Sequence, residues 1–252
     1  MLGLFQSTQV AGKAMPRVPA GTRVYAVGDI HGRFDLLEAL HREIDADARN
    51  DRGLRKVVVY LGDYVDRGPD SRNVIDYLIE EPLPGFESIH LMGNHEAFLL
   101  QFLADSTVLP SWAMNGGDAT LASYGVSPHE APSGANRAEW LRTRFREVMP
   151  RAHHNFLCAL KLSHVEGDYL FVHAGVRPGI PIEQQDPLDL LWIREPFLRS
   201  TEDFGKLVVH GHTPVRRPER RANRIDIDTG AVYGGQLTAL ALEGDTQLFL
   251  QV

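Results

Sequence analysis

Short apolar runs recur along the first third of the chain, and each run ends at a glycine followed by polar side chains. The runs cover residues 24–27, 57–61 and 89–92, and the strings after them are Gly28-Asp29-Ile30-His31-Gly32, Gly62-Asp63-Tyr64-Val65-Asp66-Arg67-Gly68 and Gly93-Asn94-His95-Glu96. Apolar runs of this length, bounded by turn residues, are typical of buried strands. We therefore predict strands at 23–28, 56–61 and 87–92 that end in Asp, Asn or His.

Helical patterns separate these strands. We predict helices near 35–48, 71–80 and 96–104. Alternation of strand and helix indicates an α/β fold with mainly parallel strands, in which ligands bind beyond the carboxyl ends of the strands. The polar strings after the strands are therefore expected to meet at one edge of a sheet.

The rest of the chain divides into a helical part and a strand-rich part. Residues 105–154 have a helical and loop-like pattern, with an amphipathic stretch at 137–148, and we expect a helical insertion that caps a site. Strands are then predicted at 158–163 and 168–172, joined as a hairpin across Glu166-Gly167, and at 207–209, 224–228, 237–242 and 246–252. Two sheets packed face to face and flanked by helices would satisfy both halves.

Composition limits the class of protein. The chain has 252 residues, 43% of them apolar and 23% charged, which fits a single soluble domain over 21–252 behind a flexible leader at 1–20. No apolar run approaches the roughly 20 residues of a membrane helix, and the first residues lack the order of a secretory signal. The net charge of −7 argues against a nucleic-acid partner, and the lone Cys158 fits a reducing cytoplasm.

Two further apolar runs also end in histidine, in Phe171-Val172-His173 and in Val208-Val209-His210-Gly211-His212. Five strand ends thus offer a set of metal-ligand side chains: Asp29, His31, Asp63, Asn94, His173 and either His210 or His212. Imidazole together with carboxylate and amide oxygens suits Mn, Fe, Zn or Co better than Ca or Mg. The set is too large for one catalytic ion, so we predict two divalent ions, with the central Asp63 bridging them.

Such a pair of ions indicates chemistry on phosphate esters. The positive charge of two divalent ions exceeds the negative charge of their carboxylate ligands, so the site attracts anions. A metal-bridging hydroxide, available near pH 7, can attack phosphorus in line. Arg67 and Arg194 are candidates to bind the phosphoryl oxygens, although Arg194 also fits a surface ion pair with Glu195. His95 is the candidate general acid, and Asp66 is expected to orient it and to raise its pKa.

Taken together with Trp192 to Glu195, Gly211 to Pro214 and Asp228-Thr229-Gly230, these motifs resemble the phosphoprotein phosphatase branch of the calcineurin-like metallophosphoesterases. The resemblance runs from about Arg23 to the C-terminus and is greatest to the bacterial and phage lambda-type protein phosphatases. It implies a two-sheet β-sandwich flanked by helices, commonly with Mn²⁺. His173-Ala174-Gly175 replaces the His-Gly-Gly of eukaryotic relatives and keeps the histidine.

The resemblance also implies a role for each site residue. One ion would be held by Asp29, His31 and Asp63, and the other by Asp63, Asn94, His173 and His212. The choice of His212 over His210 depends on the resemblance, because spacing leaves both open. Asp66 and His95 would form the acid pair, and Arg67, Arg194 and Asn94 would bind the phosphate.

We therefore expect a phosphomonoesterase that acts on phosphoserine and phosphothreonine in proteins, with a phosphorylated protein or a small phosphoester as its partner. The alternative is a dinucleoside polyphosphate hydrolase on the same fold, but such relatives usually carry Asp in place of Glu96 and lack the acid at Asp66. A silent binding module would have lost a site residue, and none is missing. Trp112 and Asn115 fit a substrate cleft and core packing equally well.

Overall fold

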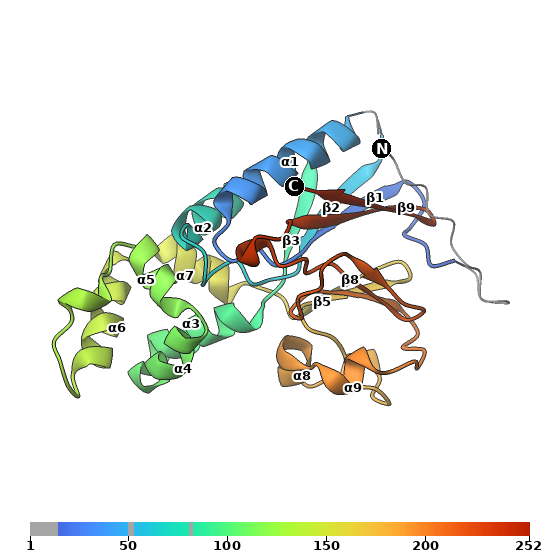
Figure 1. The fold of residues 1–252 in the computed structure, drawn as a ribbon. Coiled ribbons are helices and arrows are strands. Elements are labelled where there is room, and N and C mark those ends of the chain that lie inside the picture. The colour runs from blue at the N-terminus through green and yellow to red at the C-terminus, as the bar shows by residue number, and fades with distance from the viewer. Residues whose placement is uncertain (1–14, 50–52, 81–82) are drawn as a thin grey trace.

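The computed structural model describes residues 15–49, 53–80 and 83–252, which form two five-stranded sheets packed between helices (Figure 1). The first sheet has the strand order β10 (Thr246–Gln251), β9 (Thr238–Glu243), β1 (Thr22–Val27), β2 (Arg55–Tyr60) and β3 (Phe86–His90). The second has the order β4 (Ser163–Glu166), β5 (Tyr169–Val172), β6 (Leu207–His210), β8 (Arg224–Asp226) and β7 (Glu219–Arg220). The predicted two-sheet α/β sandwich is confirmed.

Parallel pairing forms the centre of both sheets. β2 lies between β1 and β3 in the first sheet, and β6 lies between β5 and β8 in the second. The strands at the edges are antiparallel: the β9–β10 hairpin pairs with β1, β4 pairs with β5, and β7 pairs with β8. All six parallel strands thus direct their carboxyl ends toward one side of the sandwich.

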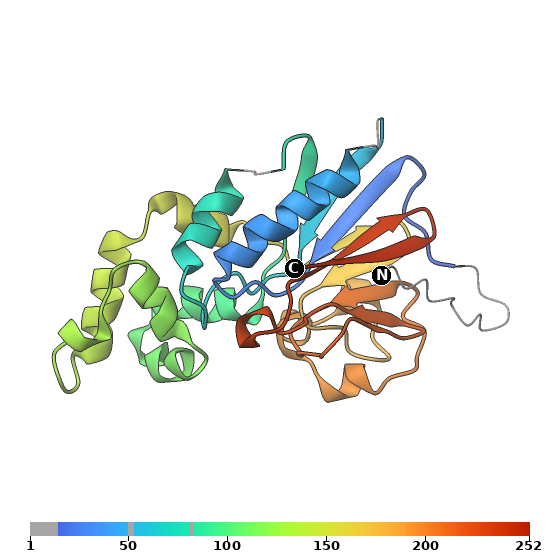
Figure 2. The same cartoon turned by 45° about the horizontal axis from the view of Figure 1, so that its top comes forward.

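Helices cover both outer faces of the sandwich (Figures 1 and 2). α1 (Phe34–Ala48) and α2 (Ser71–Ile79) cover the first sheet, whereas α8 (Pro187–Trp192) and α9 (Glu195–Leu198) cover the second. Four short 3-10 turns complete the described part of the chain: η1 (Ser106–Val108), η2 (Pro128–Glu130), η3 (Ile182–Gln184) and η4 (Ala231–Tyr233).

The remaining helices form a group at one end of the molecule (Figure 1). They are α3 (Asn94–Ala104), α4 (Leu109–Met114), α5 (Gly117–Ser123), α6 (Arg137–Val148) and α7 (Arg151–Cys158). α5 and α7 pack against α2, and α4 and α6 pack against α3. Most of the segment expected to be helical, 105–154, therefore joins the same apolar core as α1 and α2.

The strands are apolar on both faces because each sheet is covered twice. In β1, Val24 and Ala26 pack between the sheets, while Tyr25 and Val27 point toward the helices. Side chains alternate along a strand, so a strand in an inner layer needs apolar residues at both parities. This explains the unbroken apolar runs that predicted these strands.

Two expectations about elements are corrected. Residues 158–163 were expected to form a strand, but Cys158 ends α7 and β4 begins only at Ser163. His153 and Leu157, four residues apart, are the buried positions of α7, so the helical period extends to Cys158, and residues 159–162 connect the helix to β4. α3 also begins at Asn94 and not near residue 96, which places Asn94 and His95 in its first turn.

The expected leader needs a correction as well. Residues 1–14 lie outside the described part of the chain. The N–H of Arg17 donates to Asp168 Oδ2 at 3.0 Å, and buried Val18 donates its N–H to the carbonyl of Gly244 at 3.1 Å. The packed domain therefore begins before residue 21. Among the described residues, no helix has both the length and the hydropathy required to cross a membrane.

Candidate metal centre

The predicted ligand residues meet where the parallel strands of the two sheets end. Asp63 follows β2 of the first sheet and His173 follows β5 of the second, yet Asp63 Oδ1 and His173 Nε2 are 3.4 Å apart. All six predicted ligands are at least 94% buried: Asp29, His31, Asp63, Asn94, His173 and His212. The edge common to both sheets thus gathers residues that are far apart in the sequence.

Asp63 belongs to two groups of side chains whose ligand atoms lie within 4.8 Å of one another. One group is His31, Asp63 and His95, and the other is Asp63, His173 and His212. Oδ2 of Asp63 is 3.4 Å from His31 Nε2, whereas Oδ1 faces His173. Asp63 therefore has the position that a bridging carboxylate requires.

Asn94 and Asp29 complete the arrangement. Asn94 Oδ1 lies 2.9 Å from both His173 Nε2 and His212 Nδ1. Asp29 Oδ2 accepts the N–H of His212 at 3.0 Å, while its Oδ1 is buried without a hydrogen-bond partner. An unpaired buried carboxylate oxygen is costly unless a cation binds it.

The charges of these groups fit cations. Burial raises the pKa of Asp29 well above its usual value, and repulsion from Asp228 and Asp63 raises it further. Burial likewise raises the pKa of Asp63, with Glu96 as its main negative neighbour. Divalent ions would neutralise these carboxylates and stabilise their charged forms.

His173 gives an independent indication of a cation. Burial lowers the pKa of His173 well below its usual value, so the ring is neutral and has one N–H. Nδ1 lies 3.0 Å from the carbonyl oxygen of Leu61, and Nε2 lies 2.9 Å from Asn94 Oδ1. A neutral imidazole can donate to only one of these oxygens. If Nδ1 donates, the lone pair of Nε2 faces the lone pairs of nearby oxygen atoms and is repelled by them. A metal ion between these atoms would remove the repulsion.

His212, and not His210, joins the group. The Nδ1 of His210 contacts the Gly211 carbonyl at 3.0 Å, its Nε2 lies 3.9 Å from Asp226 Oδ2, and its ring packs on Phe197. The sequence left the two histidines open, and the geometry separates them.

Asp228 lies next to this centre and was not among the predicted site residues. It is buried, its charge raises the pKa of Asp29, and burial raises its own pKa. The signal for it was present in the sequence, because Asp228 is the last residue of the predicted strand 224–228 and begins the string Asp228-Thr229-Gly230.

His95 and Asp66 form a buried pair. His95 Nδ1 and Asp66 Oδ2 form a hydrogen bond of 2.7 Å, and His95 Nε2 has no hydrogen-bond partner. Burial, with a contribution from Arg67, lowers the pKa of His95 to about 3, and burial raises the pKa of Asp66 to about 7. The expectation that Asp66 raises the pKa of His95 is therefore wrong for the protein alone, whereas the expected contact that orients the ring is present.

The two predicted phosphate-binding arginines lie beside different groups. Arg67 contacts His31 Nε2, and its guanidinium lies 5.6 Å from the ring centre of Tyr233. The Nε–H of Arg194 donates to His212 Nε2 at 3.1 Å. Glu195, the alternative partner of Arg194, is paired with Arg199 instead.

The backbone at this centre is strained. Among the described residues, the non-glycine residues with positive φ are all predicted site residues: His31 (45°), Asp63 (53°), Asp66 (71°), Arg67 (69°) and His212 (67°). Each such conformation costs about 1–3 kcal/mol and persists only where surrounding contacts impose it. The site geometry is therefore imposed by tertiary contacts.

Glu96 makes several of these contacts. Its carboxylate accepts the backbone N–H groups of Asp63 at 2.8 Å, Tyr64 at 2.8 Å, Val65 at 3.2 Å and Gly93 at 2.9 Å. A Cβ at Gly93 would lie 2.1 Å from Asp63 Oδ1, so only glycine allows the approach. Glu96 thus joins the loop after β2 to the start of α3.

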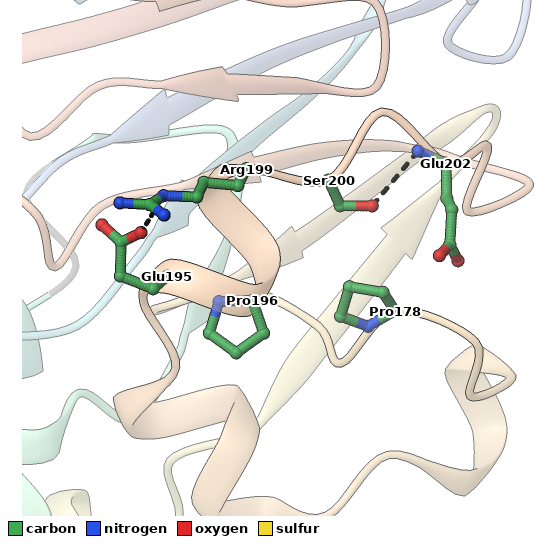
Figure 3. Close-up of a pocket in the computed structure, with 6 residues that line it drawn as sticks. All are labelled: Pro178, Glu195, Pro196, Arg199, Ser200 and Glu202. Carbon is green, nitrogen blue, oxygen red and sulfur yellow. Dashed lines mark hydrogen bonds and ion pairs between the residues drawn. The ribbon is translucent and has the colours of Figure 1, made fainter.

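A surface pocket of about 420 Å³ lies apart from these groups (Figure 3). Figure 3 shows its lining residues, which come from α9 and adjacent loops: Pro178, Glu195, Pro196, Arg199, Ser200 and Glu202. None of the predicted site residues lines this pocket, so it is not the metal centre.

Comparison with known proteins agrees with this geometry. Residues 22–235 match the calcineurin-like phosphoesterase family. The chain belongs to this family. The phosphoesterase is 31% identical over 231 residues to serine/threonine-protein phosphatase 1 of Salmonella typhimurium, covering 87% of this chain and 92% of that protein. It is also 29% identical to the asymmetrical bis(5'-nucleosyl)-tetraphosphatase PrpE of Anoxybacillus flavithermus, covering 85% and 88%.

Solved structures show the same fold for the phosphoesterase. A candidate diadenosine tetraphosphatase matches with a TM-score of 0.58 at 23% identity, over 94% of this chain and 98% of that one. A cold-active protein-tyrosine phosphatase of a Shewanella species matches with a TM-score of 0.57 at 18% identity, over 99% and 87%. The predicted family, fold and phosphoester chemistry are confirmed, and the His and Asp groups are suited to metal ions.

Proposed function

We propose that this phosphoesterase is a two-metal phosphomonoesterase of phosphoserine and phosphothreonine residues in proteins. The observation that carries the proposal is the buried Asp66–His95 pair, because an alkoxide leaving from serine or threonine needs a proton. The 31% identity to a bacterial serine/threonine phosphatase supports it. Glu96 and Asp66 also match the protein phosphatase pattern noted in the sequence.

In this proposal one ion is held by Asp29, His31 and Asp63, and the other by Asp63, Asn94, His173 and His212. We propose Mn²⁺, with Fe or Zn as alternatives. When bound, such ions polarise the phosphate ester and lower the pKa of water to about 7, so that hydroxide is available to attack phosphorus in line.

The chain's own residues supply positioning and proton transfer. Arg67 and Arg194 lie on either side of the ligand groups, so their guanidinium groups can hold the phosphoryl oxygens, with Asn94 assisting. To act as the acid, His95 must carry a proton on both ring nitrogens, which the negative charge of a bound phosphate favours. Asp66 then accepts the Nδ1–H, the Nε2–H passes to the leaving oxygen, and the ring is left neutral.

The test compares substrates for the Mn²⁺-loaded enzyme. We expect kcat/KM for phosphoserine and phosphothreonine peptides to exceed that for diadenosine tetraphosphate at least tenfold. The Asp63→Asn variant should lose activity on both, which shows that the same centre acts on them. A preference for diadenosine tetraphosphate would overturn the proposed substrate class.

A dinucleoside polyphosphate hydrolase is the second candidate. The relative of this kind at 29% identity favours it. Tyr233 also favours it, because this residue is 64% exposed beside Arg67 and its ring offers a face on which a base can stack. If this candidate holds, Tyr233→Ala should raise KM for diadenosine tetraphosphate and leave KM for a phosphopeptide unchanged.

A further inference from the structure

The carboxylate of Asp66 has more partners than His95. Besides His95 Nδ1, Oδ2 accepts the Nε1–H of Trp112 at 2.9 Å, and Oδ1 accepts the hydroxyl of Thr120 at 2.6 Å. Asp66, Trp112 and Thr120 are all completely buried. Trp112 lies in α4 and Thr120 in α5, so both donors come from the helical group and not from the strand-end motifs.

Thr120 also contacts the backbone of Asp66. Its Oγ1 accepts the N–H of Asp66 at 2.9 Å, and Ser71 Oγ accepts the same N–H at 3.1 Å. Asp66 has a φ of 71°, a conformation that its neighbours must impose. One hydroxyl group thus holds both the main chain and the carboxylate of Asp66.

Trp112 is itself held firmly. Its ring stacks on Phe102 with a centroid distance of 4.7 Å and packs on Phe145 at 6.1 Å. A Cβ at Gly117 would lie 2.3 Å from the ring, so the first residue of α5 must be glycine for the indole to fit. The direction of the indole N–H is therefore fixed by packing.

These contacts restrict the rotation of the Asp66 carboxylate. A donor occupies each oxygen, so turning the carboxylate would break a buried hydrogen bond, at a cost of about 1–3 kcal/mol. In the observed orientation Oδ2 faces His95 Nδ1, and the His95 ring then directs its unpartnered Nε2 toward the metal groups, 3.9 Å from Asp63 Oδ2.

We propose that Trp112 and Thr120 are positioning residues for the general acid. They hold Asp66 against His95 Nδ1, so that the Nε2–H of the protonated ring is directed to the leaving oxygen. The inference rests on the proposed function, because it gives the acid pair a role in phosphate ester hydrolysis. The helical group thereby takes part in catalysis without touching the substrate.

The test uses two substrates that differ in their need for a proton. A phosphoserine peptide releases an alkoxide, whereas para-nitrophenyl phosphate releases a phenolate that is stable without a proton. Trp112→Phe and Thr120→Val each remove one donor to Asp66 and keep most of the side-chain volume. We expect each to lower kcat on the phosphoserine peptide about tenfold and kcat on para-nitrophenyl phosphate less than about twofold.

Matched controls separate positioning from packing. Thr120→Ser keeps the hydroxyl and should restore kcat on the peptide. Phe145→Leu loosens the packing around Trp112 without removing a donor, and should change kcat on the two substrates by the same factor. Bound metal should be the same in all these variants, because none removes a ligand. Equal losses on both substrates in Trp112→Phe and Thr120→Val would overturn the inference.

Combined variants identify the group through which Trp112 acts. His95→Asn should lower kcat on the peptide by about 10²–10⁴ with metal content unchanged, and adding Trp112→Phe should then have no further effect. If the losses of kcat from the two single substitutions added fully in the double variant, the positioning role of Trp112 would be overturned, while His95 would remain the proposed acid. If His95→Asn lowered kcat equally on both substrates, or lost bound metal, the proposal that His95 is the general acid would also be overturned.

Discussion

Glu96 shows how a single residue stabilises strained neighbours. Its carboxylate accepts four backbone N–H groups around Asp63, whose φ is 53°. The sequence marked Glu96 only as a feature that separates two kinds of phosphoesterase. Its position indicates a further role, namely to hold Asp63 in a conformation that this residue would not adopt alone.

Replacing Glu96 by Gln should therefore destabilise the fold. The amide group has one acceptor oxygen, and its NH₂ would face backbone N–H groups, so at least one buried N–H would lose its partner. We expect the free energy of unfolding to fall by about 3 kcal/mol, measured by urea denaturation. Glu195→Gln is the control, since Glu195 is exposed on α9. Equal stability of Glu96→Gln and the wild type would contradict this role.

At the scale of elements, α1 is joined to the first sheet by a buried histidine. The hydroxyl of Tyr60 in β2 forms a hydrogen bond of 3.1 Å with Nε2 of His41, and His41 is only 3% exposed. Burial, with repulsion from His90, lowers the pKa of His41 to about 4. His41 is thus harder to protonate in the folded protein than in the unfolded chain, where its pKa has the ordinary value.

This contact gives a pH dependence with a definite sign. Above pH 6.5, the ordinary pKa of histidine, His41 is neutral in both states and costs nothing. As the pH falls from about 6.5 to 4, the unfolded chain binds a proton that the folded protein does not, so stability is lost over that window. At pH 5 the loss from His41 is about 2 kcal/mol.

The measurement is urea unfolding at pH 7 and pH 5. In His41→Gln the loss of stability between these values should be about 2 kcal/mol smaller than in the wild type, while the other buried histidines contribute equally to both proteins. The glutamine can still accept a hydrogen bond from Tyr60. An unchanged pH dependence would show that His41 is solvated or leaves its site at low pH.

At the scale of the whole molecule, the candidate metal centre joins the two sheets. Asp63 and Asn94 follow strands of the first sheet, while His173 and His212 follow strands of the second. Without cations, repulsion from Asp228 and Asp63 adds to burial in raising the pKa of Asp29. Ions at this position would relieve the repulsion and connect the sheets at the same time.

Removal of divalent ions should therefore lower the thermal stability of the protein. An ion at one hundred times its Kd adds about 2.7 kcal/mol, and each kcal/mol shifts Tm by about 2–4 °C in a chain of this size. For two ions we expect Tm to fall by at least about 10 °C when Mn²⁺ is replaced by a chelator, measured by calorimetry. Asp63→Asn should show a much smaller difference. Equal Tm values with and without Mn²⁺ in the wild type would contradict two bound ions.

The local sequence determined the strands of the first sheet, the helices between them and the residues at their ends. Unbroken apolar runs reveal strands that are covered on both faces, without reference to the rest of the chain. The meeting of the candidate ligands could be predicted because parallel strands end at a common edge. Asp63, His173 and Asn94 were brought together in this way. Family and phosphoester chemistry followed from the same strings.

Tertiary structure alone decided what depends on packing between distant segments. His210 is the last residue of β6 and His212 lies two residues beyond it, and only the path of the chain after the strand brings His212 to Asn94. The predicted strand at 158–163 is shortened because α7, which packs on α2, extends to Cys158. Trp112 and Thr120 reach Asp66 across 46 and 54 residues, so no local pattern contains the contact. Periodicity records which face of an element is buried, whereas a hydrogen bond between elements depends on where the fold places each of them.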